Sequence, residues 1–376
     1  MQVLVILVSV VYYLFVGFLI QAWRKKIPQK TNPQVREPKV SVVIAVRNES
    51  ETIGCIMDSL SRQDYSADRF EVIVMDDGST DHTSEIVQVK GKRLSCDLIL
   101  GVTGADQLGG NGKKVAITRG VELAKGELIL ITDGDCRVGP QWISSHVKWF
   151  LDYQADFLAG PVRIKGDTAF WQRWQALEFA SLVGTGAAFI NAGVPLFCNG
   201  ANMAFRKEVF LSSGGYGDNS HVPSGDDVYL MQKIYASGGK VVFVKDCKAI
   251  VETRLQPTWK DFFHQRNRWA GKWHHQHSWY GFLVPVMLFT YYFLLTVSVF
   301  LTIFGLFPWW LLLFLLVMKL VLEYIFLRNV MVFLGNKIKM GIFTISSLAY
   351  AFYALLFGIT ANLMGFQWKG RKHKRL

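Results

Sequence analysis

The sequence has few cysteines and no pairing pattern among them. Its five cysteines are widely separated, their number is odd, and no C-x-x-C pair occurs. These absences exclude a disulfide framework and a zinc site built on paired cysteines, so we expect reduced thiols in a cytoplasmic domain. No internal repeat or low-complexity tract occurs either, which excludes a repeat architecture.

Charge is absent from long apolar runs. Residues 2–20 and 281–305 carry no charged side chain, and two further apolar blocks cover about 308–328 and 341–366. Each run approaches or exceeds the length of about 20 residues that a bilayer requires. We therefore predict an integral protein of a bacterial inner or plasma membrane, with one N-terminal and about three C-terminal transmembrane helices.

The first apolar run also lacks the features of a cleaved signal peptide. No positively charged region precedes it, and no small-residue cleavage site follows it. Three cations follow instead, at Arg24, Lys25 and Lys26. The run is interpreted as an uncleaved anchor, and the positive-inside rule predicts that the downstream domain faces the cytoplasm.

Acidic residues are fewer than basic ones, with 29 Asp and Glu against 41 Lys and Arg and a net charge of +12. Residues 24–39 hold six cations against Glu37, and the tail 367–376 holds five cations. These two flanks supply ten of the twelve excess charges, and both adjoin apolar runs. Anionic lipid head groups explain that placement, so no nucleic-acid partner is expected.

Between the apolar runs, strand and helix patterns alternate. Continuous apolar strands are predicted at 40–46, 70–79, 96–102 and 127–135, with helices between them at 49–63, 83–90 and 113–125. This alternation is typical of an α/β fold with a doubly wound, mostly parallel sheet. The predicted organisation is an N-terminal transmembrane anchor at 1–22, a linker at 23–38, a catalytic domain at 39–255, an interfacial segment at 256–280, a transmembrane region at 281–366 and a basic tail at 367–376.

Acidic pairs follow the apolar strands, where ligands bind in doubly wound sheets. Asp76-Asp77 also suits a turn, in which an Asp side chain accepts backbone N–H bonds. Asp133-Gly134-Asp135 places two hard oxygen ligands on one rim, as Mg²⁺ or Mn²⁺ prefers. Asp226-Asp227 opens a predicted helix and has an alternative role as an N-terminal cap.

Taken in order, six motifs resemble those of the family 2 glycosyltransferases. They are VSVVIAVRNES, VIVMDDGSTD, GGNGKKVAITRGVELAKGELILITDGD, CNGANMAFRKEVF, GDDVYL and QRNRW, within about residues 38–270. The resemblance implies a nucleotide-sugar-binding domain of the GT-A type and an inverting transfer of a sugar. Its QRNRW segment, with Gln265, Arg268 and Trp269, is similar to the Q/R-x-x-R-W motif of the membrane-bound members.

The resemblance implies a role for each matching position. Nucleotide-sugar binding is expected of Val46, Arg47, Glu49, Asp76, Asp77, Lys113 and Asp133. Asp133 and Asp135 are the implied ligands of Mg²⁺ or Mn²⁺, and Asp227 is the implied catalytic base. Asp226 stands where the family has Glu, which leaves open which of the two carboxylates faces the acceptor. Arg268 is expected to pair with the diphosphate, and Trp269 to stack on an acceptor sugar.

The donor is expected to be a nucleotide sugar, with UDP as the nucleotide. A lipid or membrane-proximal glycan is the expected acceptor, and single transfer to a lipid is the leading hypothesis because the F-x-V-T-x-K gating element of cellulose synthases is absent. Processive synthesis of a β-linked polysaccharide is the alternative, and a non-catalytic membrane partner with the same fold is a third.

The membrane topology contains a conflict. Four spans and a cytoplasmic catalytic domain would place the basic tail outside, whereas the positive-inside rule favours the inside. One block is therefore re-entrant or interfacial, or the region 308–340 is divided differently. Lys319 and Glu323, one helical turn apart, either neutralise each other or mark that unusual block.

Overall fold

The computed structural model describes residues 1–25, 27, 36–103, 112–165, 169–217, 225–271, 279–363, 366–368 and 371–373. Most of the predicted linker and part of the basic tail lie outside these residues. The chain divides into two compact units. A sheet unit comprises Lys26–Lys165 and Phe189–Arg254, and a membrane unit comprises Met1–Lys25, Gly166–Ala188 and Leu255–Leu376.

The sheet unit is built on a seven-stranded sheet with the strand order β3-β2-β1-β4-β8-β6-β9. Strands β1, β2, β3 and β4 are parallel, β8 is antiparallel to β4 and β6, and β6 and β9 are parallel. The bounds are β1 Val40–Val46, β2 Phe70–Asp76, β3 Asp97–Val102, β4 Leu128–Asp133, β6 Phe157–Ala159, β8 Met203–Arg206 and β9 Val241–Phe243. The predicted α/β fold with a mostly parallel sheet is confirmed.

The central strands are buried because their apolar side chains face helices on both sides. Val42, Val43 and Ile44 of β1 have no exposed surface, as expected for a parallel strand covered on both faces. Helix α4 (Gly112–Leu123) packs against β1 and β2. Gly120 permits this close approach, because a Cβ there would collide with Val43.

The remaining elements of the sheet unit complete its layers. A three-stranded sheet has the order β5-β10-β7. Its strands are β5 Arg137–Val138, β7 Val162–Ile164 and β10 Val251–Thr253, and the helices of the unit besides α4 are α2 Ile53–Leu60, α3 Thr83–Gly91, α5 Trp142–Tyr153, α7 Lys207–Ser212 and α8 Asp226–Ala236.

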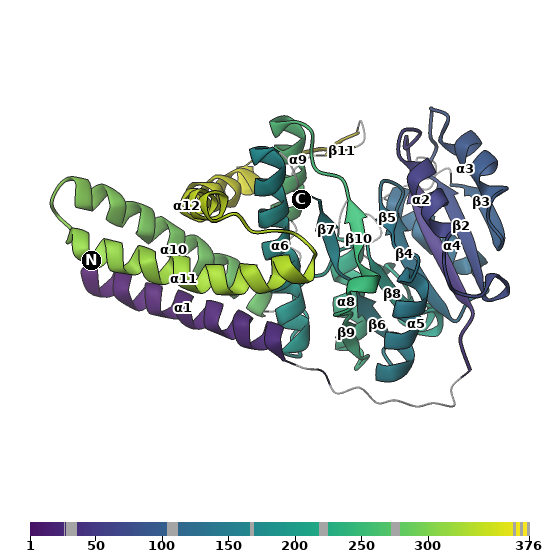
Figure 1. Ribbon diagram of the computed structural model, residues 1–376, viewed down its shortest axis with the longest axis horizontal. Coiled ribbons are helices and arrows are strands. Elements are labelled where there is room, and N and C mark those ends of the chain that lie inside the picture. Colours follow the sequence, from purple (N-terminus) through teal and green to yellow (C-terminus); the bar gives the residue numbers. More distant parts are fainter. Residues whose placement is uncertain are drawn as a thin grey trace. The chain divides into compact units, whose positions relative to one another are not determined.

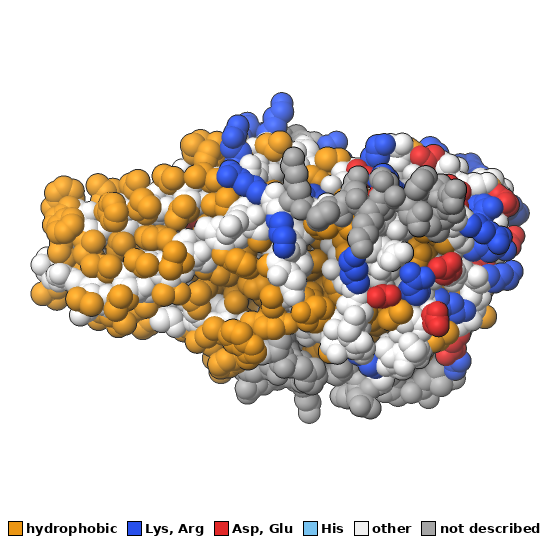
Figure 2. All heavy atoms as spheres, turned by 90° about the horizontal axis from the view of Figure 1, so that it is seen from below, with side chains coloured by type: hydrophobic (Ala, Val, Ile, Leu, Met, Phe, Trp, Pro, Cys, Tyr) orange, Lys and Arg blue, Asp and Glu red, His pale blue; other side chains and the backbone are white. Residues whose placement is uncertain are grey.

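Four helices of the membrane unit are long and apolar enough to cross a membrane: α1 Gln2–Arg24, α10 Trp279–Ile303, α11 Trp309–Phe333 and α12 Met340–Leu363. They match the four predicted apolar blocks, so the prediction of a membrane protein is confirmed. In Figure 1, α1, α10 and α11 lie side by side along their length, whereas α12 is seen nearly end-on. Figure 2 shows that hydrophobic side chains cover most of the visible face of this helical bundle.

The membrane unit also contains α9 (Trp259–Ala270) and α6 (Phe170–Asn191) up to Ala188. A short hairpin, β11 (Phe366–Trp368) with β12 (Arg371–His373), follows α12. Residues 166–188, which the sequence places within a catalytic domain of residues 39–255, thus belong to the membrane unit. Trp171 and Trp174 of α6 stack with a centroid distance of 5.1 Å and contact Phe262 of α9.

Candidate functional site

The carboxyl ends of three parallel strands meet at one edge of the main sheet. Strand β1 lies between β2 and β4, and its register pairs Val46 with Asp76 and Ala45 with Asp133. The chain turns to opposite sides of β1 here, which makes this edge a topological switch point, where ligands bind in open α/β sheets. The two predicted acidic sites therefore flank the end of the same strand.

Asp76 forms the turn that follows β2. Its carboxylate accepts hydrogen bonds from the backbone N–H of Ser79, at 2.8 Å, and from the hydroxyl of Ser84. Gly78 has a φ of 70°, a conformation that favours glycine. The turn alternative for this motif is therefore present, and the turn buries Asp76 and Asp77 at the edge of the sheet.

The predicted nucleoside-binding residues form one connected edge beside that turn. The carbonyl of Val46 accepts from the backbone N–H of Asp77 at 2.9 Å. Arg47 Nη1 donates to the Asp77 carbonyl at 2.6 Å and lies 3.7 Å from its carboxylate. Glu49 Oε2 accepts from the Thr52 hydroxyl at 2.5 Å, next to the start of α2. The structure brings these residues together, and their contact with a nucleotide stays a prediction.

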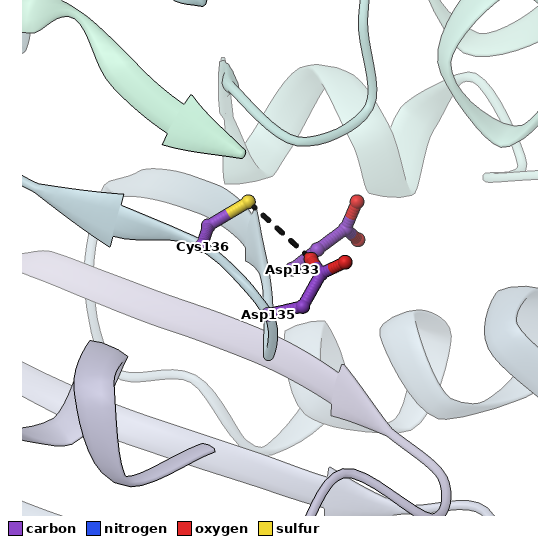
Figure 3. Close-up of side chains that lie close together, drawn as sticks. All are labelled: Asp133, Asp135 and Cys136. Carbon is purple, nitrogen blue, oxygen red and sulfur yellow. Dashed lines mark hydrogen bonds between the residues drawn. The ribbon is translucent and has the colours of Figure 1, made fainter. Parts of the chain in front are cut away.

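Asp133, the last residue of β4, and Asp135 lie side by side, together with Cys136 (Figure 3). One ligand atom from each of the three lies within 4.8 Å of the others. Burial raises the pKa of the Cys136 thiol well above its usual value, and the thiol points to Asp135 Oδ1 at 3.6 Å. A protonated thiol is a poor ligand for a hard cation. The two carboxylates fit Mg²⁺ or Mn²⁺, and Cys136 does not.

Lys113, in the first turn of α4, joins the predicted metal site to Asp226, the neighbour of the predicted base. Its Nζ lies 2.7 Å from Asp133 Oδ1 and 3.2 Å from Asp226 Oδ2. Burial alone would lower the pKa of Lys113, but the charges of Asp133 and Asp226 outweigh it and hold that pKa well above its usual value. The lysine is therefore a fixed positive charge between two carboxylates.

Asp226 and Asp227 open helix α8, where negative charge is stabilised by the helix dipole. Asp227 Oδ2 accepts from the backbone N–H of Gly200 at 3.1 Å, and its Oδ1 accepts from the N–H of Val228 at 2.8 Å. Gly225 precedes the helix with a φ of 82°, and a Cβ there would lie 2.5 Å from the ring of Tyr229. The local backbone thus holds Asp227 in one orientation.

A buried lysine next to this cluster was missed by the sequence interpretation. Lys114 is 1% exposed, and its Nζ lies 5.0 Å from the ring centroid of Tyr229 and 5.8 Å from that of Tyr216. Burial, together with Asp227, raises the pKa of Tyr229 to about 12, so its hydroxyl is neutral. The only sequence signal was the second lysine of GKK, because neither tyrosine stands in a recognisable spacing.

Gln265, Arg268 and Trp269 lie on α9, in the membrane unit. The helix begins after Thr258, whose hydroxyl oxygen accepts from the backbone N–H of Asp261 at 3.1 Å. All three predicted residues are half-buried. Their proximity to the acidic cluster, which belongs to the sheet unit, stays a prediction.

Comparison with known proteins identifies the family. The sequence profile described as "Glycosyltransferase like family 2" matches residues 38–272, more than half of the chain. The chain belongs to this family. A mannosyltransferase from Pyrobaculum calidifontis, solved in complex with GDP-Man and Mn²⁺, superposes with a TM-score of 0.57 at 19% identity, covering 93% of this chain and 96% of that one. This likeness supports the GT-A fold of the family 2 protein.

Curated relatives of this family 2 protein are similar over much of its length. The probable glycosyltransferase YdaM of Bacillus subtilis is 26% identical over 70% of this chain and 63% of its own length. The beta-monoglucosyldiacylglycerol synthase of Synechocystis is 26% identical over 62% of this chain and 47% of its own length. The chain thus spans about half to two thirds of the length of these relatives.

Proposed function

We propose that this family 2 protein transfers one sugar from a UDP-sugar to a lipid or lipid-linked acceptor at the membrane surface, with inversion at the anomeric carbon. Its four apolar helices place it in a membrane, where such an acceptor resides. Two similar proteins are named for lipid acceptors, the beta-monoglucosyldiacylglycerol synthase and an undecaprenyl-phosphate 4-deoxy-4-formamido-L-arabinose transferase of Pseudomonas syringae, 28% identical over 42% of this chain. A sugar acceptor of the polysaccharide type, extended processively, is the alternative.

One observation supports the reaction most directly, the position of Lys113 between the carboxylates of Asp133 and Asp226. The lysine links the pair Asp133 and Asp135 to the start of α8, where Asp227 stands. Two acidic sites with separate tasks, one under the diphosphate and one beside the acceptor, are what an in-line displacement requires.

The carboxylates of Asp133 and Asp135 would hold a divalent cation. When bound, Mg²⁺ or Mn²⁺ supplies a Lewis acid that stabilises the charge gained by the departing nucleotide diphosphate. Lys113 adds a fixed positive charge beside Asp133 and favours the same diphosphate. Val46, Arg47, Glu49, Asp76 and Asp77 would bind the nucleoside at the neighbouring end of β1.

Asp227 would act as the general base. The acceptor hydroxyl attacks the anomeric carbon, the bond to the diphosphate breaks, and the hydroxyl proton moves to the Asp227 carboxylate. Hydrogen bonds from the backbone N–H groups of Gly200 and Val228 fix the orientation of that carboxylate. Asp226, which pairs with Lys113, is the supporting acid. Gln265, Arg268 and Trp269 would bind the acceptor and the diphosphate.

The sheet unit would face the cytoplasm of a bacterial cell, where nucleotide sugars are made available. Arg24 and Lys25 follow the first apolar helix, as the positive-inside rule expects on the cytoplasmic side. This orientation would bring donor and lipid acceptor to the same membrane face.

The test uses the full-length chain in vesicles of phosphatidylethanolamine and phosphatidylglycerol that contain diacylglycerol or polyprenyl phosphate. Labelled UDP-sugars are supplied with Mg²⁺ or Mn²⁺, and products are separated by organic extraction and thin-layer chromatography. We expect one organic-soluble glycolipid. A ladder of long products in its place would contradict single transfer, and no turnover with any UDP-sugar would contradict the donor.

Asp227→Asn should lower the turnover number about 10² to 10⁴-fold, because general-base catalysis contributes that much. Binding of UDP, measured by titration calorimetry, should stay within about twofold of the wild type, since the amide keeps the size of the side chain. Asp68→Asn, an exposed residue of the same type, is the matched control. Unchanged turnover in Asp227→Asn would refute the assigned base.

A further inference from the structure

Arg266 lies within the QRNRW segment, at a position to which the Q/R-x-x-R-W motif gives no role. It is 2% exposed, whereas its neighbours Gln265, Arg268 and Trp269 are half-buried. A buried arginine costs free energy unless its charge and its donors are satisfied. Its partners therefore show what the residue does.

The guanidinium of Arg266 touches two of the three predicted acceptor residues. Its Nη1 donates to Gln265 Oε1, and its carbon lies over the ring of Trp269, 4.4 Å from the ring centroid. A second ring, that of Phe262, lies 4.3 Å from the same carbon. Arg266 thus holds the side chains of Gln265 and Trp269 at fixed positions on α9.

The other edge of the guanidinium is bound by Glu178 of α6. Nε donates to Glu178 Oε1 at 2.8 Å, and Nη2 donates to Glu178 Oε2, which makes the pair bidentate. The Tyr353 hydroxyl of α12 donates to Glu178 Oε1 at 2.7 Å. Glu178 is 6% exposed, so water scarcely competes for these bonds. Bidentate pairs of this kind fix geometry as well as charge.

Arg266 is not placed to bind a substrate itself. Each of its three guanidinium nitrogens already donates to a side chain of the protein, and the group is almost fully buried. Its guanidinium carbon lies over the rings of both Phe262 and Trp269, and a lysine has no planar group to make the same contacts. The residue acts on its neighbours instead of on a ligand.

We propose that Arg266, held by the bidentate pair with Glu178, is a positioning residue that orients Gln265 and Trp269 toward the acceptor. The inference rests on the proposed function, because it requires these two side chains to contact the acceptor or the diphosphate. It adds Glu178, which lies 88 positions away in the chain, to the residues that determine acceptor use.

Arg266→Lys is the first test, in the full-length chain with the vesicles, UDP-sugar and metal that give product with the wild type. Lysine keeps the positive charge, but it cannot form the bidentate pair with Glu178 and has no planar group to lie over the rings of Phe262 and Trp269. We expect kcat/KM for the acceptor lipid to fall about tenfold to a hundredfold, as for a misplaced binding group. KM for the UDP-sugar and the dissociation constant of UDP should stay within about twofold.

Glu178→Gln is the second test, because it removes the charge of the partner and leaves Arg266 in place. We expect a loss of acceptor kcat/KM similar to that of Arg266→Lys. The double variant should lose little more than either single variant, since both disrupt one unit. Lys260→Met, on the exposed side of α9, is the matched control and should behave as the wild type.

Two results would overturn the inference. The first is wild-type acceptor kinetics in Arg266→Lys. The second is a loss of activity in Arg266→Lys that equals the fall in the number of UDP-binding sites, because such a loss would indicate unfolding. Gln265→Ala and Trp269→Ala separate the two proposals. If both keep wild-type acceptor kinetics, the acceptor role in the proposed function is wrong. If both variants lose acceptor kcat/KM and Arg266→Lys keeps it, only the positioning role is wrong.

Discussion

His146 is a titratable residue in the core of the sheet unit, on α5. It is fully buried, and its Nδ1 donates to the carbonyl of Trp142 at 2.8 Å. A carbonyl can only accept, so this nitrogen carries the proton of a neutral imidazole. Burial lowers the pKa of His146 from 6.5 to about 4. The residue is consequently a source of pH-dependent stability that is separate from catalysis.

The sign of that dependence follows from the lowered pKa. Below pH 6.5 the unfolded chain binds a proton at His146 and the folded chain does not, so stability is lost as the pH falls from 6.5 toward 4. We expect His146 to account for about 2 kcal/mol of the loss between pH 7 and pH 5. His146→Gln should weaken this dependence, measured by denaturant unfolding at both pH values.

The candidate site was predictable where short motifs determine it. Asp133 and Asp135 follow an apolar strand, so their common position at the sheet edge was readable from the pattern. The salt bridges of Lys113 with Asp133 and Asp226 were not, because they join segments 20 and 113 positions apart through tertiary packing. The hydrogen bond from the Gly200 backbone N–H to Asp227 could not be predicted either, because every residue except proline has the same backbone donor.

At the scale of elements, a polar network joins the four apolar helices. Lys319 of α11 lies 2.9 Å from Glu323 Oε2 and donates to the carbonyl and hydroxyl of Ser347 in α12. Glu323 also accepts from the hydroxyls of Tyr12 in α1 and of Ser347, and Tyr12 lies 3.1 Å from the hydroxyl of Tyr292 in α10. Of the two alternatives for Lys319 and Glu323, mutual neutralisation is the one observed.

Removing one charge of this pair should cost more than removing both. Lys319→Met leaves Glu323, whose side chain is 13% exposed, without its cation, which we expect to destabilise the fold by about 3 kcal/mol. The double variant Lys319→Met with Glu323→Gln should recover part of that loss, since no charge remains. The stability of both variants is measured by thermal unfolding in detergent, with size-exclusion chromatography as the readout. A double variant no more stable than the single one would contradict the expectation.

Elements were predicted well where each buries a continuous apolar surface. Strand β1 was placed at its observed bounds, and the four apolar helices follow from hydropathy alone. Helix α6 shows the limit of this reasoning, because the sequence pattern placed it within the catalytic domain of residues 39–255. Its membership in the membrane unit depends on Glu178 and Gly184, whose partners Arg266 and Val330 are distant in the sequence.

At the scale of the whole molecule, the packing of α12 bears on the side of the membrane where the chain ends. Ser347, near its start, contacts Lys319 in the middle of α11. Further along, the ring of Phe357 lies 6.2 Å from that of Phe262, and the Thr360 hydroxyl donates to Asn267 Oδ1 at 2.7 Å. The helix therefore starts beside the middle of the bundle and ends at α9.

This course differs from that of a fourth span lying alongside the others. The helices α1, α10 and α11 run side by side, whereas α12 is seen nearly end-on in Figure 1. The strand β11 that follows α12 lies beside α9. Since α9 also leads into α10, the end of α12 and the start of α10 are on one side. Three crossings and a re-entrant α12 satisfy the positive-inside rule for the basic tail.

We therefore expect the C-terminal tail on the cytoplasmic side, together with α9. A green fluorescent protein fused after Leu376 should be fluorescent in a bacterial host, and an alkaline phosphatase fused at the same position should be inactive. The matched control is a pair of fusions after Leu306, in the connection between α10 and α11, where the phosphatase should be active and the fluorescent protein dark. An active phosphatase after Leu376 would mean that α12 crosses the membrane, and the cations of the tail would then lie on the side that the charge rule disfavours.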